Sequence, residues 1–314
     1  MPLFAADTIT AIIDCRQPAL ARHFGVAECR WWKERDEPVS DRADAQRLAW
    51  DSVAAGWQKW WPTIESGAGS VSDRMIELAE IEPGQRVLDI ATGIGEPALV
   101  AARLVGPAGR VVATDISTGM LDIARKRALA SGLTNVAFVE ADAARLDFHE
   151  GSFDAVLWRW GPTDLSNPSN TLVAIRRMLT PGGSFATAVW QAGPDARPLA
   201  RHAMSVACGM FDAPSGCAQE PTPPERSLEQ ELLHAGFSEV RVEAMTLTLA
   251  FASTDDCTRY LMDVSPVFAA LLSDRSPGQL AEYRRRLAAA LRQYVTADGS
   301  VRIPNVTLCA VGRR

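Results

Sequence analysis

The sequence is poor in the residues that would mark a metal centre or a disulfide scaffold. Its six cysteines include no C-x-x-C pair, and its four histidines lie far apart along the chain. A structural zinc site needs closely paired thiolates, and a disulfide scaffold needs a short, cysteine-dense chain. We therefore expect reduced, mostly buried thiols and no bound metal.

Long hydrophobic runs and a strong excess of one charge are also missing. No run of about 18 apolar residues is present, which argues against a membrane span. The N-terminal sequence MPLFAADTIT lacks the basic and apolar parts of a secretory signal. With 32 Lys and Arg against 38 Asp and Glu, the net charge of −6 gives no general reason to bind nucleic acid or an anionic membrane. We expect a cytoplasmic protein whose partner is a small molecule, and its oligomeric state stays open.

Short β-rich runs alternate with helical stretches between residues 71 and 190, which is typical of βα units that build a parallel sheet. The pattern predicts strands at 86–91, 110–115, 136–140, 153–158, 184–190, 239–251 and 305–311. A helical insertion between the last two strands favours an antiparallel edge pair that carries a cap. The predicted fold class is α/β: a seven-stranded, mostly parallel, doubly wound (Rossmann-like) sheet with helical caps.

Six of the nine tryptophans lie between positions 31 and 61. Trp50, Trp57, Trp60 and Trp61 recur at helical spacing, so one aromatic stripe faces either the body of the protein or a ligand pocket. We expect Pro62 to end this helix. The predicted division of the chain is an extension at 1–45, a Trp-rich cap at 46–70, a core at 71–195, a cap at 196–224, a return to the core at 225–253, a helical cap at 254–299 and a final strand at 300–314.

The most informative stretch is VLDIATGIGEPA at residues 87–98, where a strand ends, glycines allow a tight turn and a helix begins. Gly93-x-Gly95-x-x-Ala98 also satisfies the loose dinucleotide fingerprint, so a nicotinamide-dependent oxidoreductase is an alternative. Asp89 would repel a pyrophosphate, and Pro97 has no N–H to offer one. These two residues favour a ligand with a positive group and no phosphate, such as S-adenosylmethionine.

The second predicted strand ends at Asp115, twenty positions after Gly95, where a carboxylate can accept hydrogen bonds from ribose hydroxyls. Met120 follows in the next turn as a possible apolar face for adenine, and Asp142 is a possible acceptor for its amino group. Taken alone, each residue is equally well a turn cap or a core side chain. Their order along the chain favours a nucleoside site.

Five segments, VLDIATGIGEPAL, VVATDISTGML, VEADAARL, FDAVLWRWG and LTPGGSFATAVW, occur in the order of class I S-adenosylmethionine-dependent methyltransferases. The chain resembles this family, and most of all its ubiquinone/menaquinone-type branch, over about residues 46–195. The resemblance implies that the methionine end lies at the turn after the first strand, the ribose at Asp115 and the adenine near Met120. One departure is Ala91, where many members have glycine, and we expect binding to survive the extra methyl. The expected cofactor-binding residues are Asp89, Ala91, Thr92, Gly93, Gly95, Asp115, Ile116, Met120, Asp142, Ala143 and Trp158.

The acceptor should bind next to the residues after the fourth strand, because ligands of such sheets lie outside the carboxyl ends of the strands. The sequence lacks the Asn/Asp-Pro-Pro-aromatic tetrad that occurs in methyltransferases acting on amino groups of nucleic acids and glutamine. It also shows no set of metal ligands, which disfavours a magnesium-dependent O-methyltransferase. We expect methyl transfer by SN2 displacement to carbon or oxygen of a small, largely apolar or aromatic molecule. A protein that retains the cofactor without methylating is a further alternative.

The expected acceptor-binding residues are Trp57, Trp60, Arg159, Trp160, His202 and Tyr260. Among the histidines we place only His202 near the pocket, so it is the candidate catalytic base, with a structural role as the alternative. Arg159 either pairs with an acidic group of the acceptor or is tied to a helix terminus or an internal carboxylate.

Overall fold

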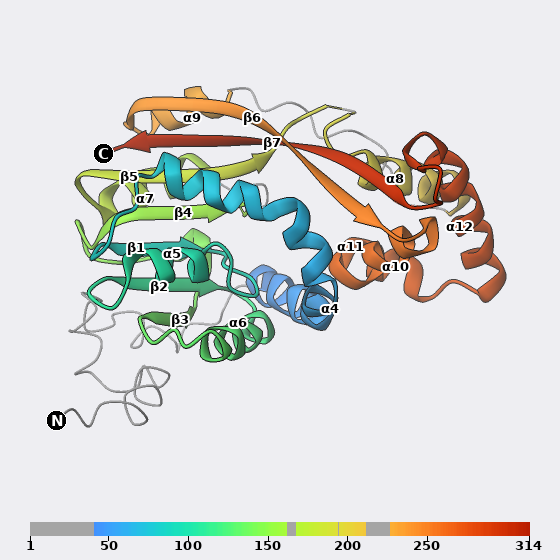
Figure 1. The fold of residues 1–314 in the computed structure, drawn as a ribbon, viewed down its shortest axis with the longest axis horizontal. Helices are drawn as coiled ribbons and strands as arrows, with labels where there is room; N and C mark the ends of the chain where they lie inside the picture. The colour runs from blue at the N-terminus through green and yellow to red at the C-terminus, as the bar shows by residue number, and fades with distance from the viewer. Residues whose placement is uncertain (1–40, 162–167, 194, 212–226) are drawn as a thin grey trace.

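A seven-stranded sheet forms the centre of the protein in a computed structural model, which describes residues 41–161, 168–193, 195–211 and 227–314 (Figure 1). The strand order is β3-β2-β1-β4-β5-β7-β6. β1 to β5 run parallel, and β7 is antiparallel to both of its neighbours. The strands are β1 Arg86–Ile90, β2 Arg110–Asp115, β3 Val136–Glu140, β4 Phe153–Arg159, β5 Leu179–Trp190, β6 Ser238–Phe251 and β7 Val301–Arg313. The predicted fold class is confirmed.

Successive side chains of the parallel strands point to opposite faces of the sheet, and helices cover both faces. Val87 and Leu157 belong to one apolar core, whereas their neighbours Leu88 and Val156 belong to another. Because both sets are fully buried, the strands read as nearly continuous apolar runs. The first core is covered by α4 Asp41–Leu78, α5 Ala98–Val105 and α6 Thr118–Ala130, and the second by α7 Pro168–Met178 and α9 Leu228–His234.

The chain reverses its direction of travel across the sheet at β1, which pairs with β2 on one side and β4 on the other. At such a switch point the connections leave the two strands in opposite directions, and a crevice opens at their carboxyl ends. The crevice follows from topology, and it places the ends of β1, β2 and β4 around one space.

A group of helices lies beyond the carboxyl ends of the parallel strands (Figure 1). β6 and β7 form a long antiparallel pair from Ser238↔Arg313 to Phe251↔Val301, and the helical insertion joins their far ends, as predicted. Tyr283 of α12 donates a hydrogen bond to the Ala203 carbonyl of α8 at 3.2 Å, which ties the insertion to the helix after β5. These elements are α8 Pro198–Met210, α10 Thr254–Val264, α11 Pro266–Ser273, α12 Pro277–Ala290 and the short η3 Arg292–Tyr294.

The expectation that Pro62 ends the Trp-rich helix was wrong. α4 continues through Pro62 to Leu78, although proline removes one backbone donor and crowds the preceding turn. Figure 1 shows α4 changing direction along its length, which is how a helix accommodates an internal proline. Packing of both halves outweighs the local cost, because Val53 and Ile64 are buried on either side of the bend. The predicted boundaries at 45 and 70 therefore fall inside one helix.

The cysteines within the described residues are reduced. Cys257 and Cys309 are buried, Cys208 is half-buried, and none of the three forms a disulfide. Within the described ranges, no helix has both the length and the apolar character needed to cross a membrane. Predictions for residues 1–40, for the proline-rich loop at 214–224 and for Cys15, Cys29 and Cys217 lie outside the described residues.

Close packing of α4 on α10 generates the first prediction. A Cβ atom on Gly56 would overlap the backbone oxygen of Asp263 at the end of α10. Gly56→Ala should lower the free energy of unfolding by about 1–3 kcal/mol, because backbone cannot move aside as a side chain can. Urea unfolding, monitored by circular dichroism, measures this change in the free energy of unfolding.

Gly69→Ala is the matched control in the same helix. Its Cβ would meet only the flexible Glu65 side chain, at 3.1 Å, so alanine's better helix propensity should leave stability unchanged or raise it by up to about 1 kcal/mol. Equal effects of the two substitutions would contradict the packing of α4 against α10.

Candidate functional site

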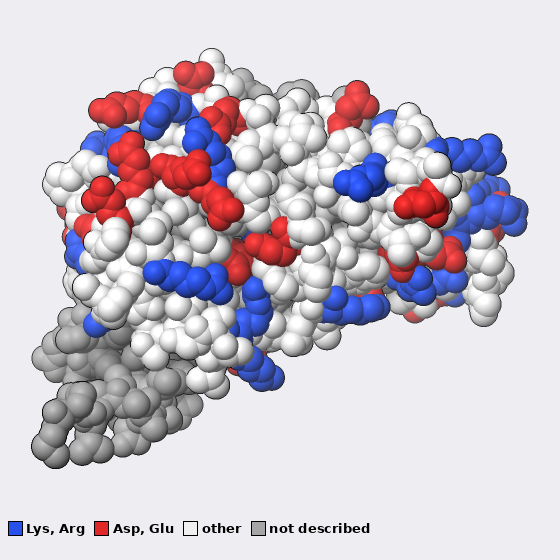
Figure 2. All heavy atoms as spheres, viewed as in Figure 1, with Lys and Arg blue, Asp and Glu red and all other residues white. Residues whose placement is uncertain are grey.

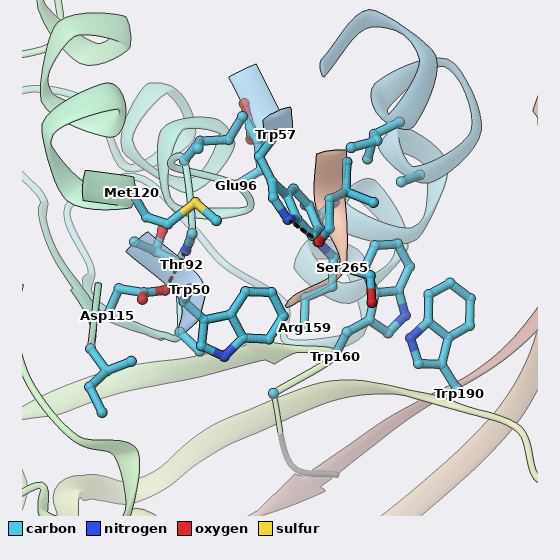
Figure 3. A pocket seen from close by; sticks show the side chains of 18 of the residues that line it. Trp50, Trp57, Thr92, Glu96, Asp115, Met120, Arg159, Trp160, Trp190 and Ser265 are labelled. Carbon is cyan, nitrogen blue, oxygen red and sulfur yellow. Dashed lines mark hydrogen bonds between the residues drawn. The ribbon is translucent and has the colours of Figure 1, made fainter. Parts of the chain in front are cut away.

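A cavity of about 470 Å³ opens at the carboxyl ends of β1, β2 and β4, beneath α4 and against α10. Its volume is within the range of roughly 300–1,000 Å³ that ligand sites usually have. Figure 3 shows its two halves: Asp115 and Met120 lie on one side, and Trp160 and Trp190 on the other. We call these the nucleoside half and the aromatic half.

The turn after β1 forms one wall of the cavity. Ala91 and Gly93 adopt left-handed backbone conformations, with φ of 54° and 55°. At Ala91 this costs roughly 1–2 kcal/mol, which is the physical reason why glycine suits that position. A Cβ on Gly93 would meet nothing within 4 Å, so its wall is open. Gly95 does not line the cavity; a Cβ at this position would lie only 3.0 Å from Leu99 Cδ1, so glycine leaves room for that side chain.

Asp89 lies behind this wall and does not line the cavity. Its Oδ2 accepts a hydrogen bond from the Ala98 N–H at 3.0 Å and so anchors the start of α5. Burial raises the pKa of this fully buried carboxyl to about 7. The direct contact that the family resemblance implies for Asp89 stays a prediction, and its observed contact is with the helix.

Asp115 brings a carboxylate into the nucleoside half at the end of β2. It accepts hydrogen bonds from the backbone N–H groups of Gly93 at 2.8 Å and Ser117 at 2.9 Å. Burial raises its pKa to about 6, against the opposing effect of these donors. Each carboxylate oxygen has a second lone pair, so the group can also accept from the two hydroxyls of a ribose.

The other expected nucleoside contacts surround the same space. Met120 is buried, and Ile116, Asp142 and Ala143 line the cavity with it. Asp142 is occupied in part, because it accepts a hydrogen bond from the Ala144 N–H at 2.9 Å and caps the short helix η1 Ala143–Arg145. Thr92 and Trp158 line the cavity as well. The predicted set is brought together, with Asp89 and Gly95 as the exceptions.

A carboxylate oxygen without a hydrogen-bond partner in the cavity wall would favour a positively charged ligand. Glu96 lines the cavity; its Oε1 pairs with Arg127 at 3.1 Å, and its buried Oε2 has no hydrogen-bond partner among the described residues. Burial raises the pKa of Glu96 above its usual range, and the nearby Arg127 opposes that shift. An ammonium or sulfonium group would favour the ionised form, so S-adenosylmethionine suits this wall.

The aromatic half contains four of the six residues that we expect to bind the acceptor: Trp57, Arg159, Trp160 and Tyr260. Trp60 does not line the cavity. It packs edge-on against Tyr260 at 5.6 Å between ring centroids and donates a hydrogen bond to Asp263 at 2.7 Å, so its role in the structure is to join α4 to α10.

His202 does not line the cavity either. Its half-buried ring lies on α8, 6.2 Å from the ring of Tyr294, and burial lowers its pKa. Along the described part of the chain, no histidine lines the cavity. Nor do three or more His, Cys, Asp or Glu side chains gather there as a metal site would require.

Several lining residues were not chosen from the sequence. Trp190 ends β5 and stacks on Trp160 at 4.5 Å and 9°; its place at a strand end was an available signal. Trp50 and Trp61 were recognised as part of the aromatic stripe, without a role. No sequence signal indicated that Glu96 lines the cavity, because the direction of its side chain depends on the ion pair with Arg127, 31 positions away.

α4 is attached to the nucleoside half by one carboxylate. Asp51 accepts hydrogen bonds from the Ser117 hydroxyl at 2.6 Å and the Gly119 N–H at 2.9 Å. Further along α4, Trp61 stacks on the guanidinium of Arg127 at 3.9 Å. These contacts hold the roof of the cavity against the turn after β2 and against α6.

Sequence comparison relates the chain to known proteins. A family model described as a methyltransferase domain matches residues 87–183. The ubiquinone/menaquinone biosynthesis C-methyltransferase UbiE of Ectopseudomonas mendocina (strain ymp) is 38% identical over 151 residues, covering 48% of this chain and 59% of that protein. UbiE of Ectopseudomonas oleovorans is 37% identical over 151 residues, covering 48% of this chain and 89% of that protein. The chain thus matches less than two thirds of the first relative and most of the second.

Solved structures share the fold. The [4+2]-cyclase SpnF superposes with a TM-score of 0.54 at 22% identity, covering 86% of this chain and 96% of that chain. A phosphoethanolamine N-methyltransferase 2 from Haemonchus contortus, in complex with S-adenosyl-L-methionine, gives a TM-score of 0.50 at 21% identity, covering 86% of this chain and 57% of that chain. At these identities the likeness concerns the fold alone.

The carboxylate of Asp115 generates a binding prediction. Asp115→Ala should weaken the binding of S-adenosylhomocysteine by about 1.5–3 kcal/mol, the range for hydrogen bonds to a charged group. Calorimetry on folded protein measures it. Asp154→Ala is the control, because Asp154 pairs with Arg86 at 3.0 Å at the opposite end of the sheet. Unchanged affinity in Asp115→Ala would remove this residue from the site.

The raised pKa of Asp89 predicts a pH dependence of stability. An unfolded aspartate ionises near pH 3.9, so between about pH 4 and pH 7 the native state holds more protons and becomes less stable as the pH rises. Asp89→Asn keeps the acceptor for the Ala98 N–H but does not ionise. Its stability relative to the ligand-free wild type should therefore rise by about 1 kcal/mol or more between pH 5 and pH 8.

Denaturant unfolding across this pH range measures the difference. The stability of Asp115→Asn relative to the wild type should also rise with pH. The midpoint of this rise should lie at lower pH, because burial raises the pKa of Asp115 only to about 6. A stability difference between the wild type and Asp89→Asn that stays constant from pH 5 to pH 8 would contradict the predicted effect of the raised pKa.

Proposed function

The chain belongs to the class I S-adenosylmethionine-dependent methyltransferases, and we propose that it methylates a small, largely apolar or aromatic molecule at carbon or oxygen. The observation that carries the proposal is one continuous cavity, lined at one end by Asp115 and Met120 and at the other by Trp57, Trp160 and Tyr260. The first end suits a nucleoside, and the second suits a ring.

The cofactor belongs in the nucleoside half. Asp115 accepts from the ribose, Met120 and Ala143 contact the adenine, and the open wall at Gly93 lets the backbone approach the ligand closely. Glu96 provides negative charge where the ammonium and sulfonium would lie. This assignment rests on the cavity lining and on the order of these residues along the chain.

When bound, the cofactor would supply a methyl group on a positively charged sulfur: in-line SN2 displacement would break the S–CH3 bond, form the bond to the acceptor carbon or oxygen and leave S-adenosylhomocysteine, with any proton displaced from the acceptor released to water. The contribution of the chain is alignment and the exclusion of water. Trp57 is held in place because its indole N–H donates to the Val264 carbonyl at 2.9 Å, and Trp160 because its N–H donates to Thr307 at 3.1 Å. Fixed rings of this kind orient an acceptor at little entropic cost.

The acceptor class follows from the walls of the aromatic half. Leu247, Leu249, Leu261 and Phe268 also line it. Both UbiE relatives are named as C-methyltransferases of ubiquinone and menaquinone biosynthesis, which favours a quinone-type ring and transfer to carbon. Figure 2 shows basic and acidic side chains mixed over one face of the molecule, and this mixture, with the net charge of −6, disfavours nucleic acid as the acceptor.

Methyl transfer tests the proposal directly. Protein incubated with methyl-labelled S-adenosylmethionine and a short-chain prenylated hydroquinone, or a small-molecule extract, should pass label to an organic-soluble product. Asp115→Ala should lower the rate about tenfold or more at subsaturating cofactor, in line with its lost binding energy.

Two other results would redirect the assignment. Binding of NADH without binding of S-adenosylhomocysteine, measured by calorimetry, would support an oxidoreductase. Tight binding of S-adenosylhomocysteine with no label transferred to any molecule of the extract would support a protein that retains the cofactor for another purpose. Fold alone does not separate these cases, since a cyclase shares it.

A further inference from the structure

Arg159 places a buried positive charge in the middle of the cavity. It is the last residue of β4, lines the cavity and is only 8% exposed. Figure 3 shows it between Trp50, on the nucleoside side, and Trp160, on the aromatic side. A charged group at this point lies where the two ligands of the proposed reaction would meet.

The guanidinium of Arg159 has few partners among the described residues. Its Nη1 donates to the Ser72 hydroxyl at 2.7 Å, and its Cζ lies 4.8 Å from the centroid of the Trp160 ring. Among the described residues no carboxylate forms an ion pair with it, and no other hydrogen bond satisfies its remaining N–H groups. An arginine has five such donors in a fork that matches an oxyanion.

Arg127, a half-buried arginine, shows how this protein pairs such a side chain when the pairing is internal. It contacts Glu96 at 3.1 Å, donates to the Ile94 carbonyl at 2.5 Å and stacks on Trp61. Arg159 has no comparable set of contacts. The difference indicates that the described residues do not supply a full set of partners for Arg159, which leaves its donors to a ligand.

The carboxylates near Arg159 do not take that role. Glu65, Glu96 and Asp89 attract its charge from a distance and offset part of the cost of burying it, whereas burial itself lowers its pKa. Glu96 pairs with Arg127 through its Oε1, and Asp89 accepts from the Ala98 N–H. Glu65 forms no ion pair with Arg159, and its buried Oε2 has no hydrogen-bond partner among the described residues. An arginine stays protonated even when buried, so its donors remain available to a ligand.

We propose that the acceptor carries an anionic oxygen, of the carboxylate or phenolate type, which pairs with Arg159 while the apolar body lies against Trp57, Trp160 and Tyr260. This inference rests on the proposed function and narrows its substrate class to apolar anions. The acceptor end is favoured over the methionine end because Arg159 contacts Trp160, which stacks on Trp190 in the aromatic half.

Naphthalene probes that differ only in charge test the proposal. Calorimetry on protein saturated with S-adenosylhomocysteine would compare 2-naphthoate with the neutral 2-naphthamide. The anion should bind about tenfold tighter or more, as expected for a charge-assisted hydrogen-bond pair. A third probe, 2-naphthol, separates the two oxygen types: its affinity should rise with pH as it ionises if phenolates are accepted. Equal affinity for naphthoate and naphthamide, with no rise for naphthol, would overturn the proposal.

Matched variants assign the effect to a residue. Arg159→Met should remove the preference for naphthoate and Arg159→Lys should keep part of it, whereas Arg197→Met, at the other arginine that lines the aromatic half, should retain it. Loss of the preference in Arg197→Met alone would place the anion elsewhere and overturn the assignment. If Arg159→Met weakens S-adenosylhomocysteine binding and leaves the preference intact, Arg159 serves the methionine carboxylate, and the proposal fails.

The saturation step separates this inference from the proposed function. Failure of the wild type to bind S-adenosylhomocysteine counts against the methyltransferase assignment. Normal binding with no charge preference counts only against the anionic acceptor. Near-ultraviolet circular dichroism of each variant establishes that it is folded, and the wild-type comparison of the probes stands without any variant.

Discussion

The carboxylate of Asp115 is the point on which the rest of the site depends. Its two oxygens accept from Gly93 and Ser117, which belong to the turns after two different strands. A buried carboxylate must find donors, and here the donors are backbone groups of the two turns that form the floor of the cavity. Asp51 of α4 then accepts from Ser117 and Gly119, so the roof is fastened to the same turn.

α4 joins the two halves of the cavity because one bent helix contacts both. Its second half packs on the sheet, where Val71 and Met75 are fully buried. Its first half reaches the helical insertion, where Trp57 and Trp60 donate hydrogen bonds to Val264 and Asp263. The covering of the nucleoside half and one wall of the aromatic half therefore belong to the same helix.

Charge is divided along the cavity in a way that suits the proposed chemistry. The nucleoside half contains the carboxylates of Asp115, Asp142 and Glu96, whereas Arg159 stands at the start of the aromatic half. A cationic cofactor is favoured on one side and an anionic acceptor on the other. Where the anionic group is itself the nucleophile, as a phenolate would be, displacement at the sulfonium removes both of their charges, so a low-dielectric cavity between rings favours the transfer.

The sequence by itself determined the strands, the glycine turn and the position of Asp115, because alternation, turn chemistry and strand ends are local properties of the chain. The tertiary structure decided the features that depend on contacts between residues distant in the sequence. Pro62 stays inside a helix because packing on both sides outweighs a local cost. Asp89 faces the start of α5, and Glu96 faces the cavity, although both lie in one short motif. The direction of each side chain depends on partners distant in sequence, such as Arg127 for Glu96, and only the folded chain brings them together.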